Sequence, residues 1–141
     1  MNARLLYRIA AVVLVLFAAG HTFGFLAFRP ESPEGLAVFN AMNHVHFDFN
    51  GAPRSYADFY VGFGLLVTAY LLFSAVLAWH LGGLAVSQPR AIGMLAWAFA
   101  LLQLVNLVLS ILYFFIVPAT MSAAVLVCLL WAAWLIRKRE A

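Results

Sequence analysis

Hydrophobic residues run along most of this chain in four long stretches, separated by short polar segments. The stretches cover about residues 5–28, 56–81, 92–115 and 119–136. Each is close to or above the roughly 20 residues of helix that cross the hydrocarbon of a bilayer. We therefore predict an all-α fold: a four-transmembrane-helix bundle formed by one integral membrane domain over residues 1–141.

The first stretch has a second interpretation. Arg4 and Arg8 precede it, and small residues at 18–20 lie near its end. The same arrangement is typical of a secretory signal with a small-residue cleavage site. We favour a retained helix, because three further stretches follow and because apolar sequence continues after His21.

The longest polar connection is the loop at residues 29–55. Ser32 followed by Pro33 predicts the start of a helix, with serine as the N-cap and proline at the first helical position. Apolar positions then recur at helical spacing from Leu36 to Met42. We therefore expect a short helix lying at the membrane interface.

Beyond this helix the pattern changes to a two-residue period. His44, His46, Asp48 and Asn50 alternate with valine and phenylalanine. Such alternation predicts an extended segment with its polar side chains on one face. Asn50 followed by Gly51, and then Pro53, indicate turns.

The remaining boundaries follow from caps and helix breakers. Ser55 and Asp58 match the capping box that opens a helix, here the second span. Glycines at 82–83 and the segment 88–90 predict the next loop. Pro118 interrupts the apolar sequence and predicts the opening of the fourth helix.

Composition supports the membrane interpretation. The chain is 67% hydrophobic and 9% charged, with a mean hydropathy of +1.02, whereas soluble domains carry roughly 25% charged residues. Lipid must therefore be the main solvent. The net charge of +3 comes without a basic patch on a soluble face, so we expect no nucleic-acid partner. A single cysteine, Cys128, excludes an internal disulfide.

Charge also predicts an orientation. Arg4, Arg8, Arg90 and the basic residues at 137–139 fall on one side of a four-span topology, while most acidic residues fall on the other. The positive-inside rule then places both termini in the cytoplasm and the loop 29–55 outside. We expect a multi-pass protein of a bacterial plasma (inner) membrane. Tryptophans form an interfacial belt on the cytoplasmic side: Trp79, Trp97, Trp131 and Trp134.

Polar residues inside the spans gather toward the outer side. Gln103, Asn106, Ser110 and Tyr113 follow helical spacing along one stripe of the third span. His21 lies about 10 Å inside the outer end of the first span, level with Asn106 and Ser110. We predict an outward-facing polar pocket for a lipid or a hydrophobic small molecule. Its expected lining is His21, Arg54, Asp58, Tyr60, Asn106, Ser110 and Tyr113.

Three of these residues are candidates for acid–base catalysis: His21, Asp58 and Tyr60. The sequence holds none of the familiar nucleophile, zinc-protease or nucleotide-binding motifs, which disfavours a hydrolase of known type. The alternative is that the polar residues only hydrogen-bond one helix to another. Whether the protein is an enzyme stays open at this point.

A metal or haem site is a second alternative. His44, His46 and Asp48 would share one face of an extended segment, and two imidazoles with a carboxylate suit zinc, copper or iron. Haem would need His21 with His44 or His46, because His80 lies at the opposite end of its span. The competing interpretation is an interfacial loop whose apolar residues enter the lipid.

A third alternative is a non-catalytic subunit that acts through protein partners. Gly20 and Gly24 flank His21 in a small-xxx-small pattern, which lets two membrane helices approach closely. A homo-oligomer formed through these glycines is therefore a candidate assembly.

The loop and the second span carry a resemblance. The run His46-Phe-Asp-Phe-Asn-Gly-Ala-Pro-Arg-Ser-Tyr-Ala-Asp-Phe-Tyr-Val-Gly-Phe-Gly64, preceded by Gly20-His-Thr-Phe-Gly24, resembles a family of small bacterial four-span membrane proteins with no assigned activity. In length and span count the chain is also broadly similar to DoxX-like proteins. The resemblance covers nearly the whole chain and implies a four-helix membrane bundle. It implies no particular chemistry.

Overall fold

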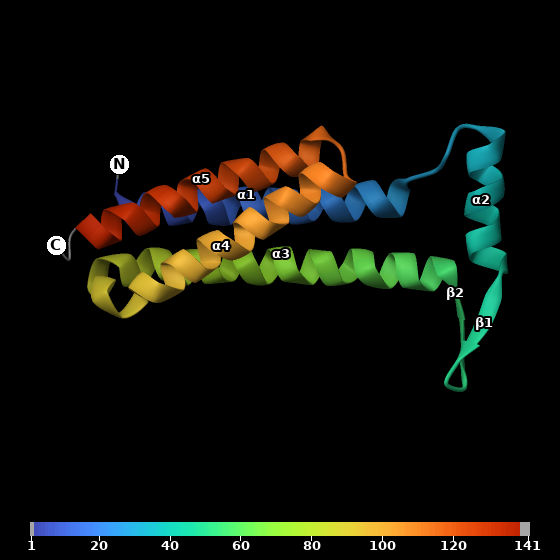
Figure 1. The fold of residues 1–141 in the computed structure, drawn as a ribbon, viewed down its shortest axis with the longest axis horizontal. Coiled ribbons are helices and arrows are strands. Elements are labelled where there is room, and N and C mark those ends of the chain that lie inside the picture. Colours follow the sequence, from blue (N-terminus) through green and yellow to red (C-terminus); the bar gives the residue numbers. More distant parts are fainter. Residues whose placement is uncertain (1, 139–141) are drawn as a thin grey trace. The chain divides into compact units, whose positions relative to one another are not determined.

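The computed structural model describes residues 2–138, and it is 85% helical. Four long helices are each long and apolar enough to cross a membrane, which confirms the predicted all-α architecture with four membrane-capable helices. They are α1 (Ala3–Ala27), α3 (Tyr56–Ser87), α4 (Pro89–Tyr113) and α5 (Ile116–Lys138). A short helix, α2 (Pro33–His44), and two strands, β1 (His46–Phe49) and β2 (Ala52–Ser55), lie between α1 and α3 in the sequence (Figure 1).

The chain divides into two compact units. One, the helical unit, consists of the residues up to Phe17 and from Leu71 onward. The other, the hairpin unit, is Ala18–Tyr70. Helices α1 and α3 each contribute to both units.

The helical unit has a core of apolar and small side chains. Ala10, Ala78 and Ala132 are fully buried, together with Leu14 and Leu129. Small side chains let helix backbones approach closely, which is how membrane helices pack when lipid offers no hydrophobic driving force between them. In Figure 1, α4 and α5 run side by side and are joined by a short connection.

The loop predicted at Gly82 and Gly83 is wrong, because α3 continues as a helix to Ser87. Gly82 is buried, and a Cβ built there would lie 3.2 Å from the Cβ of Tyr7 and 3.3 Å from the backbone oxygen of Arg4. The glycine therefore permits a close approach of α1 to α3 and does not mark a turn. A single residue, Gln88, separates α3 from α4.

The start predicted for the fourth helix is also displaced. The helix α5 begins at Ile116, before Pro118, and the break falls at Phe114 and Phe115. Proline is tolerated in the first turn of a helix because the amide hydrogens there have no partner within the helix. Pro118 is therefore compatible with the first turn but does not define its first residue.

Both helix starts predicted in the hairpin unit are confirmed. The Ser32 hydroxyl accepts a hydrogen bond from the Gly35 amide (3.0 Å), with Pro33 as the first residue of α2. At the start of α3, the Ser55 hydroxyl accepts from the Asp58 amide (3.1 Å) and the Asp58 carboxylate accepts from the Ser55 amide (2.8 Å). This reciprocal pair is a capping box.

The alternating segment forms half of a β-hairpin. Strands β1 and β2 pair antiparallel, with His46 opposite Ser55. Asn50 (φ 54°) and Gly51 (φ 82°) both adopt positive φ, the conformation of the two-residue type I′ turn that suits a hairpin. The turn at Asn50 and Gly51 is thus confirmed, whereas the turn predicted at Pro53 is wrong, because Pro53 lies in β2 opposite Asp48. His44, however, is the last residue of α2 and not part of the strand, because the helical hydrogen bonding continues to the end of α2.

Side chains join α1 to α3 within the hairpin unit. The Nε2–H of His21 donates to the Gly64 carbonyl oxygen (3.0 Å), which also accepts from the Thr68 hydroxyl (3.1 Å). The hydroxyl oxygens of Thr22 and Thr68 are hydrogen-bonded at 2.8 Å. These bonds fix the two helices in register beside the hairpin.

Candidate functional site

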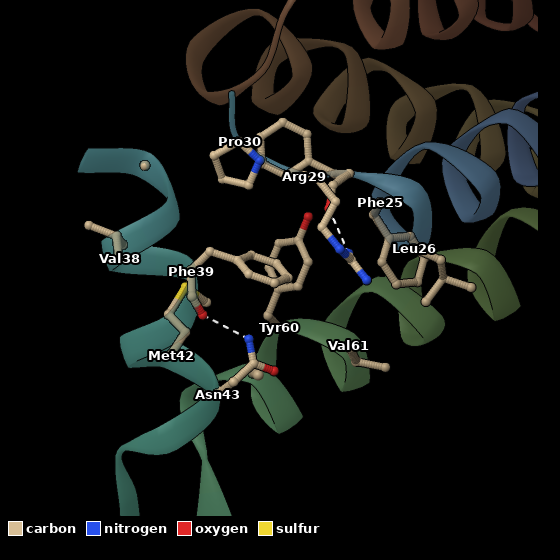
Figure 2. Close-up of a pocket in the computed structure, with 13 residues that line it drawn as sticks. Phe25, Leu26, Arg29, Pro30, Val38, Phe39, Met42, Asn43, Tyr60 and Val61 are labelled. Atoms are coloured by element: carbon tan, nitrogen blue, oxygen red, sulfur yellow. Dashed lines mark hydrogen bonds between the residues drawn. The ribbon is translucent and has the colours of Figure 1, made fainter. Parts of the chain in front are cut away.

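The hairpin unit contains a cavity of about 440 Å³, within the range of roughly 300–1,000 Å³ found for small-molecule sites. It lies between the end of α1, one face of α2 and the first turns of α3 (Figure 2). Its lining consists of Phe25, Leu26, Phe28, Arg29, Pro30, Gly35, Val38, Phe39, Met42, Asn43, Ala57, Tyr60 and Val61. Most of these side chains are apolar.

One face of α2 forms a wall of the cavity. Gly35, Val38, Phe39, Met42 and Asn43 all line it, and their spacing is that of a single stripe along a helix. Sequence reasoning found part of this stripe as an interfacial helix but assigned it no ligand. The signal in the sequence is the spacing of Gly35, Val38, Phe39 and Met42, which puts small and apolar residues on one face of a helix outside the four spans.

Aromatic contacts fix the opposite wall. The Phe25 ring lies 5.1 Å from the His21 ring and makes an edge-on contact with Tyr60 at 6.1 Å, centroid to centroid. A Cβ built on Gly64 would lie 2.7 Å from the Phe25 ring. The ring therefore occupies the space that the glycine leaves free, and it is held between α1 and α3.

Three polar side chains reach this largely apolar space: Arg29, Asn43 and Tyr60 (Figure 2). The Arg29 guanidinium donates through Nη1 to the Phe28 carbonyl oxygen (2.8 Å) and lies over the Phe39 ring at 4.9 Å. The Asn43 amide donates to the Phe39 carbonyl oxygen (2.7 Å). An apolar pocket with a few placed polar groups is typical of a small-molecule site.

Of the residues predicted to line a pocket, Tyr60 lines this cavity. His21 does not line the cavity; it is bonded to Gly64, and its ring makes a tilted contact with the Phe25 ring. Asp58 is engaged in the capping box at the start of α3. Arg54 lies in β2, where its Nη1 donates to the Pro53 carbonyl oxygen (3.0 Å).

The other predicted residues belong to the helical unit. Asn106 donates to the Ser122 hydroxyl (3.1 Å), and the hydroxyls of Ser110 and Ser122 lie 3.4 Å apart. Ser122 is fully buried, so this cluster joins α4 to α5 by hydrogen bonds inside the unit. Tyr113 is 74% exposed. The hydrogen bonds of Asn106 and Ser110 to Ser122 are those expected if the polar residues only join one helix to another.

The three candidate metal ligands belong to two different elements of secondary structure. His44 ends α2, whereas His46 and Asp48 lie in β1. The Nδ1–H of His46 donates to the His44 carbonyl oxygen (2.9 Å), and Asp48 accepts from the Gly51 amide (2.6 Å). Within residues 2–138, no three His, Cys, Asp or Glu side chains converge as metal ligands.

Gly20 and Gly24 lie on an open face of α1. A Cβ added at either position would meet no described atom within 4 Å, apart from the helix itself. Lipid covers such a face as readily as a second protein helix does, so the open face does not by itself identify a partner.

Searches against protein-family models, curated proteins and solved structures found no match to this chain. The class of protein therefore follows from the fold alone. Within residues 2–138, four helices are long and apolar enough to cross a membrane, which supports a multi-pass helical membrane protein.

Proposed function

We propose that this membrane protein binds a lipid or a hydrophobic small molecule in the cavity of the hairpin unit. The observation that carries the proposal is the cavity itself: about 440 Å³, lined mainly by apolar and aromatic side chains with three polar groups. Filling a cavity with this apolar lining by water costs free energy, and an apolar ligand would release that water. The proposed role is therefore ligand binding.

Binding is a better proposal than acid–base catalysis. His21 and Asp58 each have a structural hydrogen-bond partner, Gly64 and Ser55. Gly64 lies on α3 and Ser55 is the residue immediately before that helix, nine positions earlier, which is about 13 Å at helical rise. A general acid and base must both reach one substrate, and neither residue lines the cavity.

The cavity is proposed to face outward. Basic residues lie near the two chain ends and the connection at 88–90, which favours both termini in the cytoplasm. One of these basic residues, Arg139, lies outside the described residues. Exposed aromatic rings on the hairpin and α3, including Phe49 (60%) and Phe63 (63%), are compatible with burial at the outer headgroup level.

Cysteine labelling tests this orientation. In a Cys128→Ser background, we expect Glu31→Cys to react with a membrane-impermeant maleimide on intact cells. The matched variant Gln88→Cys is exposed on the connection between α3 and α4, and it should react only after the cells are opened. The reverse labelling pattern would place the cavity on the cytoplasmic side.

Filling the cavity tests the binding proposal. Ala57 lines the cavity, so Ala57→Phe should reduce the affinity for a polarity-sensitive fluorescent fatty acid by about tenfold, or 1.4 kcal/mol. The matched control is Ala69→Phe, because Ala69 is exposed on the same helix and does not line the cavity. Val38→Trp fills the cavity from α2 and covers the case in which Ala57→Phe does not fold. Unchanged affinity in both filling variants would contradict the proposal.

A further inference from the structure

Arg29 gives the cavity a definite charge. It is the only lining residue with a formal charge, and no aspartate or glutamate is among the lining residues. In the part of the chain that the structure describes, its contacts are a backbone carbonyl and an aromatic face, not a carboxylate. The positive charge beside the cavity is therefore not neutralised by the surrounding side chains.

The Arg29 side chain is exposed, and its guanidinium makes two contacts. Its bond to Phe28 and its position over the Phe39 ring both involve residues of the cavity wall. A planar guanidinium has several N–H donors, so one bond to a carbonyl leaves others for a ligand. Figure 2 shows Arg29 and the Phe39 and Tyr60 rings directed into the same space. Such a fork of donors matches carboxylates and phosphates, and the carboxylate is the smaller of the two head groups for a cavity of about 440 Å³.

The rest of the lining suits a hydrocarbon chain. Leu26, Val38, Ala57 and Val61 supply aliphatic surface, and Met42 adds a flexible thioether that adapts to irregular shapes. The volume of about 440 Å³ lies in the lower part of the range for small-molecule sites, which favours one chain over two.

We infer that the ligand is a single-chain lipid with a carboxylate head group, whose head pairs with Arg29 while its chain fills the apolar part of the cavity. This inference rests on the proposed function. A quaternary ammonium lipid is the main competitor, because aromatic rings bind such cations. Arg29 already covers the Phe39 face and repels a second cation, so the anionic ligand is favoured.

Matched amphiphiles test the charge. The full-length protein, in nanodiscs of phosphatidylcholine, is titrated with tetradecanoate, tetradecanol, tetradecyltrimethylammonium and acetate, each as a competitor of a fluorescent fatty acid. We expect tetradecanoate to bind about tenfold more tightly than tetradecanol, with the cationic amphiphile and acetate weakest. Arg29→Gln should remove the preference for tetradecanoate, and Arg29→Lys should retain part of it.

Arg54→Gln is the control, because Arg54 makes the same kind of bond to the preceding carbonyl but does not line the cavity. It should keep the full preference. If Arg29→Gln does not fold, salt decides the question in the native chain, since high salt should weaken binding of tetradecanoate and not of tetradecanol. Equal binding of the acid and the alcohol, or tighter binding of the ammonium or acetate, would overturn the inference and leave apolar binding intact. Failure of all the long-chain competitors to bind would overturn the proposed function as well.

Discussion

Gly82→Leu should destabilise the helical unit by about 1–3 kcal/mol, the range for forcing extra carbon atoms into a packed core. At this position a Cβ would already lie 3.2 Å from the Tyr7 Cβ and 3.3 Å from the Arg4 backbone oxygen. These neighbours are close to the backbone, so they cannot move aside by changing a rotamer. Helices α1 and α3 would have to separate. The measurement is the thermal unfolding midpoint of the purified protein in detergent.

Gly83→Leu is the matched control for this substitution. Gly83 is the next residue of the same helix, it is exposed, and an added Cβ there meets no described atom within 4 Å beyond its own helix. Replacing glycine by leucine in a helix removes a propensity penalty of about 0.5–1 kcal/mol. We therefore expect an unchanged or higher midpoint for this variant. Equal midpoints for the two variants would show that the close approach at Gly82 contributes little to stability.

Gly64→Leu should abolish most ligand binding, with an expected loss of about a hundredfold, or 2.8 kcal/mol. A Cβ at this position would lie 2.7 Å from the Phe25 ring, so the ring must move. Phe25 lines the cavity and contacts both His21 and Tyr60. Its displacement changes the shape of the wall on the α1 side. Competition with the fluorescent fatty acid measures the loss.

Gly62→Leu separates this effect from a general effect of leucine on α3. Gly62 precedes Gly64 by two positions on the exposed part of the same helix, and a Cβ there meets no described atom within 4 Å beyond the helix itself. Binding should be retained in this variant. A hundredfold loss in both variants would mean that the position of Phe25 does not determine the affinity.

The architecture could be predicted because its causes are local. A span is recognised by its length and apolar composition, and caps such as Ser55 with Asp58 act within a few residues. The boundary at Gly82 could not be predicted in this way. A glycine in a helical sequence can mark either a turn or a close approach of another helix, and the deciding contact is with Tyr7, which is remote in the sequence. His44 was predicted to lie in the extended segment because the residues around it fit both a helical and a two-residue period.

The cavity was harder to predict than the spans. Tyr60 was among the residues predicted to line a pocket, whereas Arg29 was not. The importance of Arg29, which lies in the connection between α1 and α2, depends on the position of Phe39 on α2. Depth along a helix axis places residues at one level, yet it does not determine which face they occupy. Asn106, for example, bonds to Ser122 on α5, a partner that helical spacing within one span cannot reveal.

The division into two units has a spectroscopic consequence. All four tryptophans belong to the helical unit, and the segment from Ala18 to Tyr70 contains none. The emission of the native protein is therefore dominated by indoles outside the unit that holds the cavity. One tryptophan introduced into α2, in a chain whose own tryptophans are replaced by phenylalanine, would give the hairpin unit a separate optical signal.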